Sequence, residues 1–279
     1  MSLSLDNIVP SFRLDGSVSI VTGGSGGLAS VITKALLAQG SEIAVVDLNL
    51  ERTKEAAELL IEWGKENLAK ANGGSVPRVT YWACNVADAA NVEEVFTNVN
   101  KEHGKLAEYL VHCAGYCENF PAHEYPARNA ESLVQVNLLG SLYVSQSFAR
   151  PLIKSGHRNG SIVLVGSMSG TIVNDPQPQV AYNMSKAGVI HLARSLACEW
   201  APYNIRVNTL SPGYILTPLT RNVISGHTEM KDSWESKVPM KRLAEPNEFV
   251  GSVLYLLSKT GSSYTTGHNL VVDGGYECW

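Results

Sequence analysis

The sequence predicts an α/β fold in which helices cover both faces of a seven-stranded, mostly parallel sheet. Short apolar runs alternate with stretches of helical periodicity along almost the whole chain. The runs are nearly continuous in Val, Ile and Leu, which is typical of parallel strands buried on both faces. A glycine-rich turn follows the first run and leads into a helical stretch. Together these features indicate a single doubly wound domain of the Rossmann type.

The expected elements follow this alternation in chain order. Strands are predicted at 18–22, 43–47, 79–84, 109–112, 162–166, 205–210 and 270–273. Helices are predicted at 28–39, 51–71, 92–103, 130–150 and 182–200. We expect an N-terminal extension at 1–15 and one domain at 16–279. The late excursion at 217–243 is either a mobile substrate lid or a static surface segment.

Composition narrows the class of protein. The 279 residues are 44% hydrophobic and 17% charged, which suits one large domain. A formal charge of -4 argues against a surface for nucleic acid or membranes. No apolar run reaches the ~18 residues of a membrane span, and no signal peptide is visible. The five cysteines lack metal-binding spacing. We therefore expect a soluble, cytoplasmic protein with reduced thiols and no metal site.

The glycine turn at 23–27 has the strand–turn–helix context of a dinucleotide-phosphate site. Glycines allow the backbone to approach a pyrophosphate, and the helix N-terminus stabilises its charge. Asp47 ends the next strand, near the ~20-residue spacing of an acid that binds the adenosine ribose. A simple strand-end turn residue is the alternative. Because a carboxylate accepts hydrogen bonds from ribose hydroxyls and repels the 2′-phosphate of NADP, we expect NAD(H).

Tyr182 and Lys186 are one helical turn apart, so they share a helix face. An unperturbed phenol titrates near pH ~10, and a neighbouring cation favours the phenolate. We therefore expect Lys186 to lower the pKa of Tyr182, so that the phenol exchanges protons with a carbonyl or hydroxyl oxygen. An ordinary pair on a helix surface is the alternative.

In this order the motifs resemble those of the classical short-chain dehydrogenases/reductases over almost the full chain. Residues 22–29 resemble the family's TGxxxGxG turn, 112–115 its NNAG strand end, 136–137 its helix asparagine, 166–170 its serine segment and 212–213 its Pro-Gly motif. Ala29 replaces the last glycine of the turn, and His112 and Cys113 replace the paired asparagines. We interpret His112 as structural. None of these departures removes a residue to which the family motifs assign a chemical role.

The resemblance implies a catalytic tetrad of Asn137, Ser167, Tyr182 and Lys186. Tyr182 would act as general acid for ketone reduction and as general base for alcohol oxidation. Ser167 would orient the substrate oxygen. Lys186 would also hold the nicotinamide ribose, and Asn137 would support a water that links Lys186 to solvent. As alternatives, Asn137 caps or kinks its helix and Ser167 is an ordinary strand-end serine.

The resemblance also implies a set of cofactor contacts. Ile215, through its backbone, and Thr217, through its hydroxyl, would hold the nicotinamide carboxamide, which decides the ring face that reacts. Asn85 stands where the family usually has an aspartate near the adenine. The full expected set is Gly23, Ser25, Gly27, Leu28, Asp47, Asn85, Val86, Ala114, Gly115, Tyr182, Lys186, Pro212, Gly213, Ile215 and Thr217.

Within the family the chain most resembles polyol dehydrogenases, at 116–121, at 168–174 and in its C-terminal third. The resemblance implies an acyclic polyol and its ketose as substrates, which need several convergent hydrogen-bonding groups. Candidate hydroxyl partners are Ser169, Glu118, Asn174, Gln177 and Tyr214, each of which is otherwise a solvated loop residue. The alternatives are substrates of the xylulose, sorbose or mannitol/fructose type, a hydrophobic ketone, and a non-catalytic NAD-binding redox sensor.

The resemblance finally implies a homo-oligomer, either a dimer or a tetramer. The helices at 130–150 and 182–200 would pack against a partner subunit, and the tail at 274–279 would lie near another interface. The alternative is that the apolar stripes of these helices simply face the sheet.

Overall fold

A wholly parallel seven-stranded sheet forms the centre of the protein, as the apolar runs predicted. The computed structural model describes residues 8–69, 75–156, 159–218, 220–221 and 228–278. The strand order is β3-β2-β1-β4-β5-β6-β7. The strands are β1 (Val18–Thr22), β2 (Glu42–Asp47), β3 (Val79–Ala83), β4 (Tyr109–His112), β5 (Gly160–Val165), β6 (Ile205–Pro212) and β7 (Asn269–Val272).

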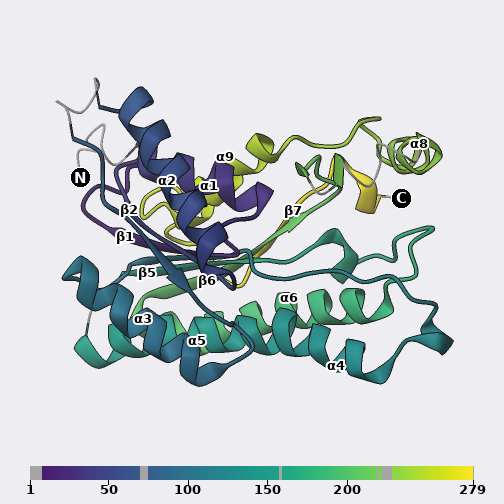
Figure 1. Ribbon diagram of the computed structural model, residues 1–279, viewed down its shortest axis with the longest axis horizontal. Helices are drawn as coiled ribbons and strands as arrows, with labels where there is room; N and C mark the ends of the chain where they lie inside the picture. The colour runs from purple at the N-terminus through teal and green to yellow at the C-terminus, as the bar shows by residue number, and fades with distance from the viewer. Residues whose placement is uncertain (1–7, 70–74, 157–158, 219, 222–227, 279) are drawn as a thin grey trace.

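Helices cover both faces of this sheet (Figure 1). On one face lie α1 (Gly27–Ala38), α2 (Leu50–Asn67) and α9 (Val250–Leu257). On the other lie α3 (Ala89–His103), α4 (Ala127–Val134), α5 (Gly140–Ser155) and α6 (Val180–Trp200). A separate apolar cluster fills each of the two layers between helices and sheet. Both faces of the strands are therefore buried, which confirms the predicted doubly wound architecture.

Two helical regions differ from the prediction. The expected helix at 130–150 is divided, because a π-helical segment, η3 (Gln135–Leu139), separates α4 from α5. Such segments widen a helix locally and often mark functional positions, and this one carries Asn137. Among the described residues, the helices α8 (Thr228–Lys237) and α9 were not predicted. The sequence of α8 is mostly polar, and α9 is so continuously apolar that it shows no helical periodicity.

The strand order reverses between β1 and β4, which opens a crevice at the carboxyl ends of the central strands. The turn after β1 closes tightly onto the end of β4 at this point. Gly23 has a φ of 65°, in the left-handed region. A Cβ atom there would lie 2.7 Å from the backbone nitrogen of Ala114. Only glycine satisfies both the conformation and the close approach.

The expected extension and lid are described in part. Leu14 is buried, and the Ser11 backbone nitrogen donates to Thr260, which fastens the end of the extension to the domain. Residues 1–7 of the extension lie outside the described residues, as do 219 and 222–227 of the excursion at 217–243. Within that excursion, Thr217 and Pro218 pack against Gly27, so that its start is anchored on the glycine turn.

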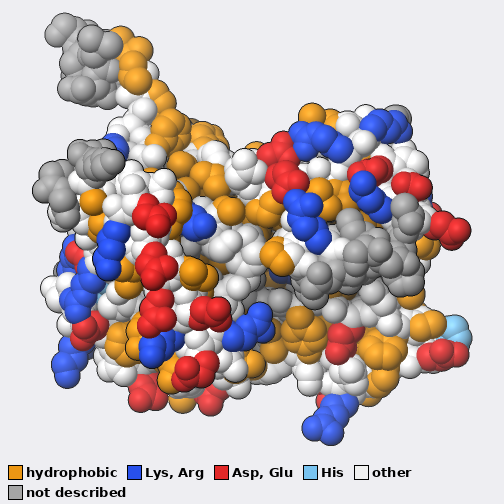
Figure 2. Space-filling model, turned by 45° about the horizontal axis from the view of Figure 1, so that its top comes forward, with side chains coloured by type: hydrophobic (Ala, Val, Ile, Leu, Met, Phe, Trp, Pro, Cys, Tyr) orange, Lys and Arg blue, Asp and Glu red, His pale blue; other side chains and the backbone are white. Residues whose placement is uncertain are grey.

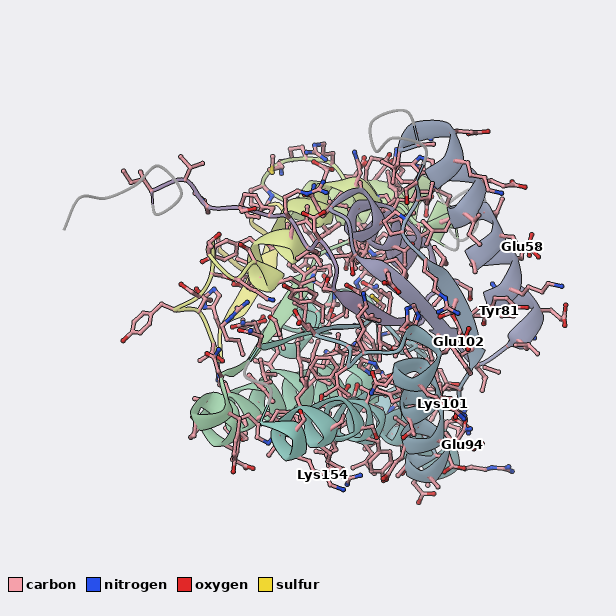
Figure 3. The ribbon with its side chains drawn as sticks, turned by 90° about the vertical axis from the view of Figure 1, so that its left-hand side faces the viewer. Glu58, Tyr81, Glu94, Lys101, Glu102 and Lys154 are labelled. Atoms are coloured by element: carbon pink, nitrogen blue, oxygen red, sulfur yellow. The ribbon has the colours of Figure 1, made fainter. Side chains whose placement is uncertain are left out.

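The visible surface carries interspersed charges of both signs (Figure 2). At the edge formed by β3, Tyr81 lies between the polar faces of α2 and α3, which carry Glu58 and Glu102 (Figure 3). Over the described residues, every helix falls short of the length or the apolar character that crossing a membrane requires.

Replacing Gly23 by alanine should lower the free energy of unfolding by about 2–5 kcal/mol, because a left-handed φ and an overpacked backbone contact add. Gly104 is a matched control, since its φ is 69° and a Cβ there meets no atom within 4 Å. Gly104→Ala should cost only about 1–2 kcal/mol. Urea unfolding followed by circular dichroism measures both. Equal losses of unfolding free energy in the two variants would contradict the close approach of Gly23 to the Ala114 backbone.

Candidate active site

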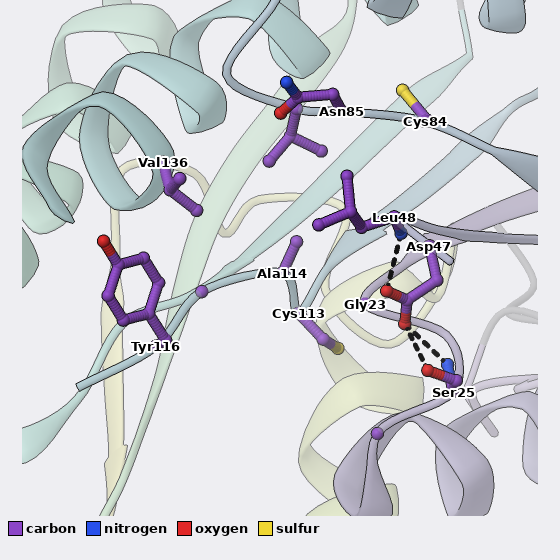
Figure 4. A pocket seen from close by; sticks show the side chains of 13 residues that line it. Gly23, Ser25, Asp47, Leu48, Cys84, Asn85, Cys113, Ala114, Tyr116 and Val136 are labelled. Carbon is purple, nitrogen blue, oxygen red and sulfur yellow. Dashed lines mark hydrogen bonds between the residues drawn. The ribbon is translucent and has the colours of Figure 1, made fainter. Parts of the chain in front are cut away.

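The crevice at the ends of β1 to β4 is a cavity of about 330 Å³ (Figure 4). The turn after β1, the end of β2, the segments after β3 and β4, and the π-helical segment enclose it. Its lining is Gly23, Ser25, Gly26, Asp47, Leu48, Cys84, Asn85, Val86, Cys113, Ala114, Gly115, Tyr116 and Val136. Seven of the expected cofactor residues are thereby brought together: Gly23, Ser25, Asp47, Asn85, Val86, Ala114 and Gly115.

Asp47 joins the end of β2 to the glycine turn (Figure 4). Its Oδ2 accepts hydrogen bonds from the Ser25 backbone nitrogen at 3.0 Å and from the Ser25 hydroxyl at 2.6 Å. Its Oδ1 accepts from the Leu48 backbone nitrogen at 2.7 Å. A carboxylate has about four acceptor positions, so the three bonds leave acceptor capacity for a ligand hydroxyl. The turn and the acid thus form one preorganised unit.

The start of α1 suits a phosphate group. Gly26 precedes the helix, and no side chain caps the first turn. The orphan N–H groups of that turn and the helix dipole favour an anion. On the opposite side of the crevice, the Asn85 oxygen accepts from the Ala87 backbone nitrogen at 3.1 Å, which fixes its side chain. These residues fit a dinucleotide that spans the crevice.

The remaining expected cofactor residues lie elsewhere. Tyr182, Gly213, Ile215 and Thr217 line a second hollow, whereas Gly27, Leu28, Pro212 and Lys186 line neither cavity. Sequence reasoning missed six residues that line the crevice: Gly26, Leu48, Cys84, Cys113, Tyr116 and Val136. Each is a direct chain neighbour of a predicted residue, and all but Val136, which lies in η3 beside Asn137, are next to the end of a strand or in the turn that follows it.

The second hollow has a volume of about 290 Å³ and lies beyond the ends of β5 and β6. Its lining is Cys117, Ser167, Met168, Ser169, Asn174, Gln177, Gln179, Tyr182, Gly213, Tyr214, Ile215, Thr217, Thr220 and Trp234. This lining contains no Asp, Glu, Lys or Arg side chain among the described residues. The hollow therefore suits a neutral, hydroxyl-rich molecule better than a phosphorylated or carboxylated one.

Tyr182 and Lys186 face each other, with the Lys186 Nζ 5.6 Å from the centre of the Tyr182 ring. The buried ammonium donates to the carbonyl of Val165 at 2.7 Å, and burial lowers the pKa of Lys186 to about 8. Burial raises the pKa of Tyr182 to about 12, while a hydrogen bond with Ser167 lowers it.

The expected lowering of the Tyr182 pKa by Lys186 is therefore wrong for the protein's own groups. Burial is the largest influence on the phenol, so the pKa of Tyr182 is raised although the Lys186 ammonium lies over its ring. At neutral pH these groups keep Tyr182 protonated.

Asn137 is 1% exposed, and both its side-chain oxygen and its side-chain nitrogen are hydrogen-bonded. Its oxygen accepts from the backbone nitrogen of Tyr116 at 3.0 Å, and its nitrogen donates to the Tyr116 carbonyl at 2.9 Å. The same nitrogen donates to the Ser185 hydroxyl at 3.1 Å. Asn137 thus joins the segment after β4 to the helix that carries Tyr182 and Lys186.

A chain of hydrogen bonds leads away from Ser167. Its hydroxyl donates to Ser169 at 3.0 Å, and Ser169 donates to the Asn174 oxygen at 2.6 Å. The Asn174 nitrogen donates to the Tyr214 hydroxyl at 3.2 Å, which donates to the Gln177 oxygen at 2.6 Å. The Ser167 oxygen in turn accepts a hydrogen bond from the Ser169 backbone nitrogen at 3.1 Å, and Ser167 is also hydrogen-bonded to Tyr182.

Of the five expected substrate residues, Ser169, Asn174, Gln177 and Tyr214 line the hollow, and Glu118 does not. The Glu118 carboxylate instead accepts from Asn129 and Tyr125.

Sequence reasoning missed five residues that line the hollow: Cys117, Met168, Gln179, Thr220 and Trp234. The Gln179 nitrogen lies within hydrogen-bonding distance of three oxygens, on Ser169, Asn174 and Asn183. Trp234 comes from α8, a helix that carried no recognised motif.

His112 is buried, and its Nδ1 lies 2.6 Å from the Thr22 hydroxyl. Burial lowers the pKa of His112 to about 3, so the imidazole is neutral and joins β1 to β4. All five cysteines are free thiols. Among the described residues, no three His, Cys, Asp or Glu side chains gather as a metal-binding group.

Comparisons with known proteins agree with this geometry. The family model described as enoyl-(acyl carrier protein) reductase matches residues 23–277. D-arabinitol 2-dehydrogenase [ribulose-forming] of Scheffersomyces stipitis is 69% identical over 279 residues, covering 100% of both chains. NADH-dependent L-xylulose reductase of Ambrosiozyma monospora is 56% identical over 99% of this chain and 100% of its own.

The crystal structure of a short-chain type dehydrogenase/reductase from Mycobacterium marinum has a TM-score of 0.85 and 31% identity, and covers 96% of this chain and 98% of its own. The fold, the crevice and the sequence similarity agree across the full length. The chain is an oxidoreductase that uses a nicotinamide cofactor, and it belongs to the short-chain dehydrogenase/reductase family.

Proposed function

We propose that the protein is an NAD-dependent polyol oxidoreductase that interconverts D-arabinitol and D-ribulose. The main support for this proposal is the second hollow, whose lining is uncharged and rich in hydrogen-bonding groups. Tyr182 and Ser167 are part of that lining. Three relatives named D-arabinitol 2-dehydrogenase [ribulose-forming], 68% to 69% identical over 99% to 100% of this chain, support the choice of substrate.

In this proposal Asn137, Ser167, Tyr182 and Lys186 form the catalytic tetrad. A bound nicotinamide supplies the acceptor or donor of the hydride at the reacting carbon. Tyr182 exchanges the proton of the reacting oxygen, and the Ser167 hydroxyl would hydrogen-bond to that oxygen and orient it. Lys186 holds the nicotinamide ribose. Asn137 fixes the backbone between the two cavities and supports a water beside Lys186, through which the proton reaches solvent.

The cofactor contacts in this proposal are those expected from the sequence, centred on Asp47. Its remaining acceptor capacity suits a ribose hydroxyl, and its charge disfavours a 2′-phosphate. Ile215 and Thr217 line the hollow next to Tyr182, where they would hold the carboxamide. NAD is therefore proposed over NADP.

The protonation state of Tyr182 affects which direction of the reaction is favoured at a given pH. With a pKa raised to about 12 by burial, Tyr182 is a proton donor at neutral pH, which suits reduction of the ketose. Oxidation of the polyol requires the phenolate and therefore gains as the pH rises. The xylulose, sorbose and mannitol/fructose types remain alternative substrates, and the xylulose-reducing relative favours the first of them.

The assembly proposed is a homo-oligomer, a dimer or tetramer, in the cytoplasm. A largely apolar groove on α5 and α6 supports it, lined by Leu142, Gln146, Ala149, Arg150, Ile153, Leu192, Ser195, Leu196, Glu199 and Trp200. The tail at 274–279 remains a proposed second contact, although Trp279 lies outside the described residues. The segment at 217–243 is proposed as the substrate lid, since Thr217, Thr220 and Trp234 from this segment line the hollow.

Purified protein with NAD and D-arabinitol should produce NADH, measured as a rise in absorbance, and the rate should increase with pH because Tyr182 must lose its proton. D-ribulose with NADH should react fastest at lower pH. Other pentitols and hexitols serve as the comparison. If no polyol or ketose changes the NADH absorbance while NADH binding is measurable, a redox sensor would be favoured instead.

Tyr182→Phe should reduce turnover by about 10²–10⁴-fold, because the proton donor is removed. Affinity for NADH, measured by quenching of protein fluorescence, should remain close to that of the parent. Tyr203→Phe is the matched control, since Tyr203 is exposed and lies outside both cavities. Retention of full activity by Tyr182→Phe would remove Tyr182 from the mechanism.

Asp47→Asn should shift the ratio of kcat/KM for NAD over NADP by about 10–100-fold towards NADP, because an acceptor is weakened and a repulsive charge is lost. Glu51→Gln removes a charge of the same sign from the exposed first turn of α2 and should leave the ratio unchanged. An identical ratio in the parent and Asp47→Asn would exclude Asp47 as the selecting group.

A further inference from the structure

Asn174 lies at the centre of the hydrogen bonds that hold the wall of the second hollow. It belongs to the loop between η4 (Met168–Gly170) and α6, and it is 5% exposed. Its oxygen accepts from the Ser169 hydroxyl at 2.6 Å and from the Gln179 nitrogen at 3.0 Å. Its nitrogen donates to the Tyr214 hydroxyl at 3.2 Å. One amide therefore joins η4, the start of α6 and the segment after β6.

The capacity of this amide indicates how it acts on a ligand. An amide oxygen has two lone pairs, and here Ser169 and Gln179 donate to both of them. A substrate hydroxyl would have to displace one of these donors before it could donate to Asn174. Ser169, Gln179 and Tyr214 themselves line the hollow. Asn174 is therefore placed to act on a ligand through these three neighbours.

The same bonds fix the protons of two hydroxyl groups in the wall. An amide oxygen only accepts, so the single proton of the Ser169 hydroxyl is directed at Asn174. The Tyr214 hydroxyl accepts from Asn174 and directs its own proton at the Gln177 oxygen, 2.6 Å away. With these protons fixed, the wall offers a ligand one pattern of hydrogen-bonding groups.

We propose that Asn174 is a positioning residue, which fixes the pattern of hydrogen-bonding groups that the hollow presents to the hydroxyls of a polyol or ketose. It does so by holding Ser169, Gln179 and Tyr214 in one arrangement. This inference rests on the proposed function and adds to it a residue that acts without touching the substrate. An acyclic substrate is selected by such convergent groups, because a misplaced partner leaves a hydroxyl unpaired.

The serine of the tetrad depends less on this amide. Ser167 donates to the Ser169 hydroxyl, but it is also hydrogen-bonded to Tyr182 and to the Ser169 backbone nitrogen. These two bonds remain when Asn174 is replaced. Loss of the amide therefore weakens the binding of substrate more than the transfer of the proton.

The test replaces the amide by an apolar side chain of similar size. In Asn174→Leu, KM for D-ribulose should rise about tenfold, with kcat and NADH affinity changed by less than about twofold. Asn174→Asp keeps an acceptor for Ser169 and Gln179 and should bring KM to within about threefold of the parent. Asn100→Leu is the matched control. Its amide oxygen accepts from the Ala107 backbone nitrogen at 2.9 Å, outside both cavities, so KM should not change.

Three kinetic results would overturn the inference: an unchanged KM in Asn174→Leu, a loss confined to kcat, or an equal rise of KM in Asn174→Asp. A crystal structure of Asn174→Leu without substrate gives a second readout. The side chains of Ser169, Gln179 and Tyr214 should leave their present positions, and their retention would also overturn it.

If Asn174→Leu does not fold, Ser169→Ala and Tyr214→Phe decide the question in a chain that keeps Asn174. Because these two side chains share the amide, their effects on KM for D-ribulose should be non-additive in the double variant. Additive effects would overturn the inference. A parent protein inactive on every polyol and ketose would instead refute the proposed function, and the crystal structure of Asn174→Leu would still test the positioning role.

Discussion

The buried ammonium of Lys186 is the interaction on which the site depends. A charge out of contact with water is costly unless it is paired or solvated by fixed dipoles. Here the Val165 carbonyl accepts its hydrogen bond at the end of β5, and the Tyr182 ring lies beneath it at 5.6 Å. The position of a Cβ on Gly115 would be only 3.6 Å from the same nitrogen. Three segments distant in sequence must therefore be correctly placed before this charge is tolerated.

The parallel sheet provides that placement. Neighbouring strands end at one edge, so the turn after β1, the acid at the end of β2 and the serine after β5 converge there. Asn137 then joins the segment after β4 to α6 through Tyr116 and Ser185. The crevice beside the glycine turn and the second hollow are consequently parts of one hydrogen-bonded frame. A change in strand register would separate them.

The same frame explains why the tyrosine does not behave as its neighbour's charge alone suggests. Burial of Tyr182 raises its pKa, and Lys186 donates one of its hydrogen bonds to the Val165 carbonyl. The polar chain from Ser167 to Gln177 is similarly directional, because each donor faces the next acceptor. It orients the serine oxygen, holds Tyr214 and, through stacking, fixes Trp234. The Ser167 and Tyr214 side chains of the hollow are therefore held by one supporting network.

The sequence by itself determined the doubly wound fold, the glycine turn with Asp47, and the pairing of Tyr182 with Lys186, because these depend on local periodicity and short spacings. The place of Ser167 came from the resemblance of its segment to the family motif. Only the tertiary structure decided the interruption of the helix at Asn137, the removal of Glu118 from the hollow and the protonation of Tyr182. The same is true of Gln179 and Trp234, whose neighbours come from distant segments. Solvation, burial and hydrogen-bond pairing are properties of the packed chain, which no local pattern of residues encodes.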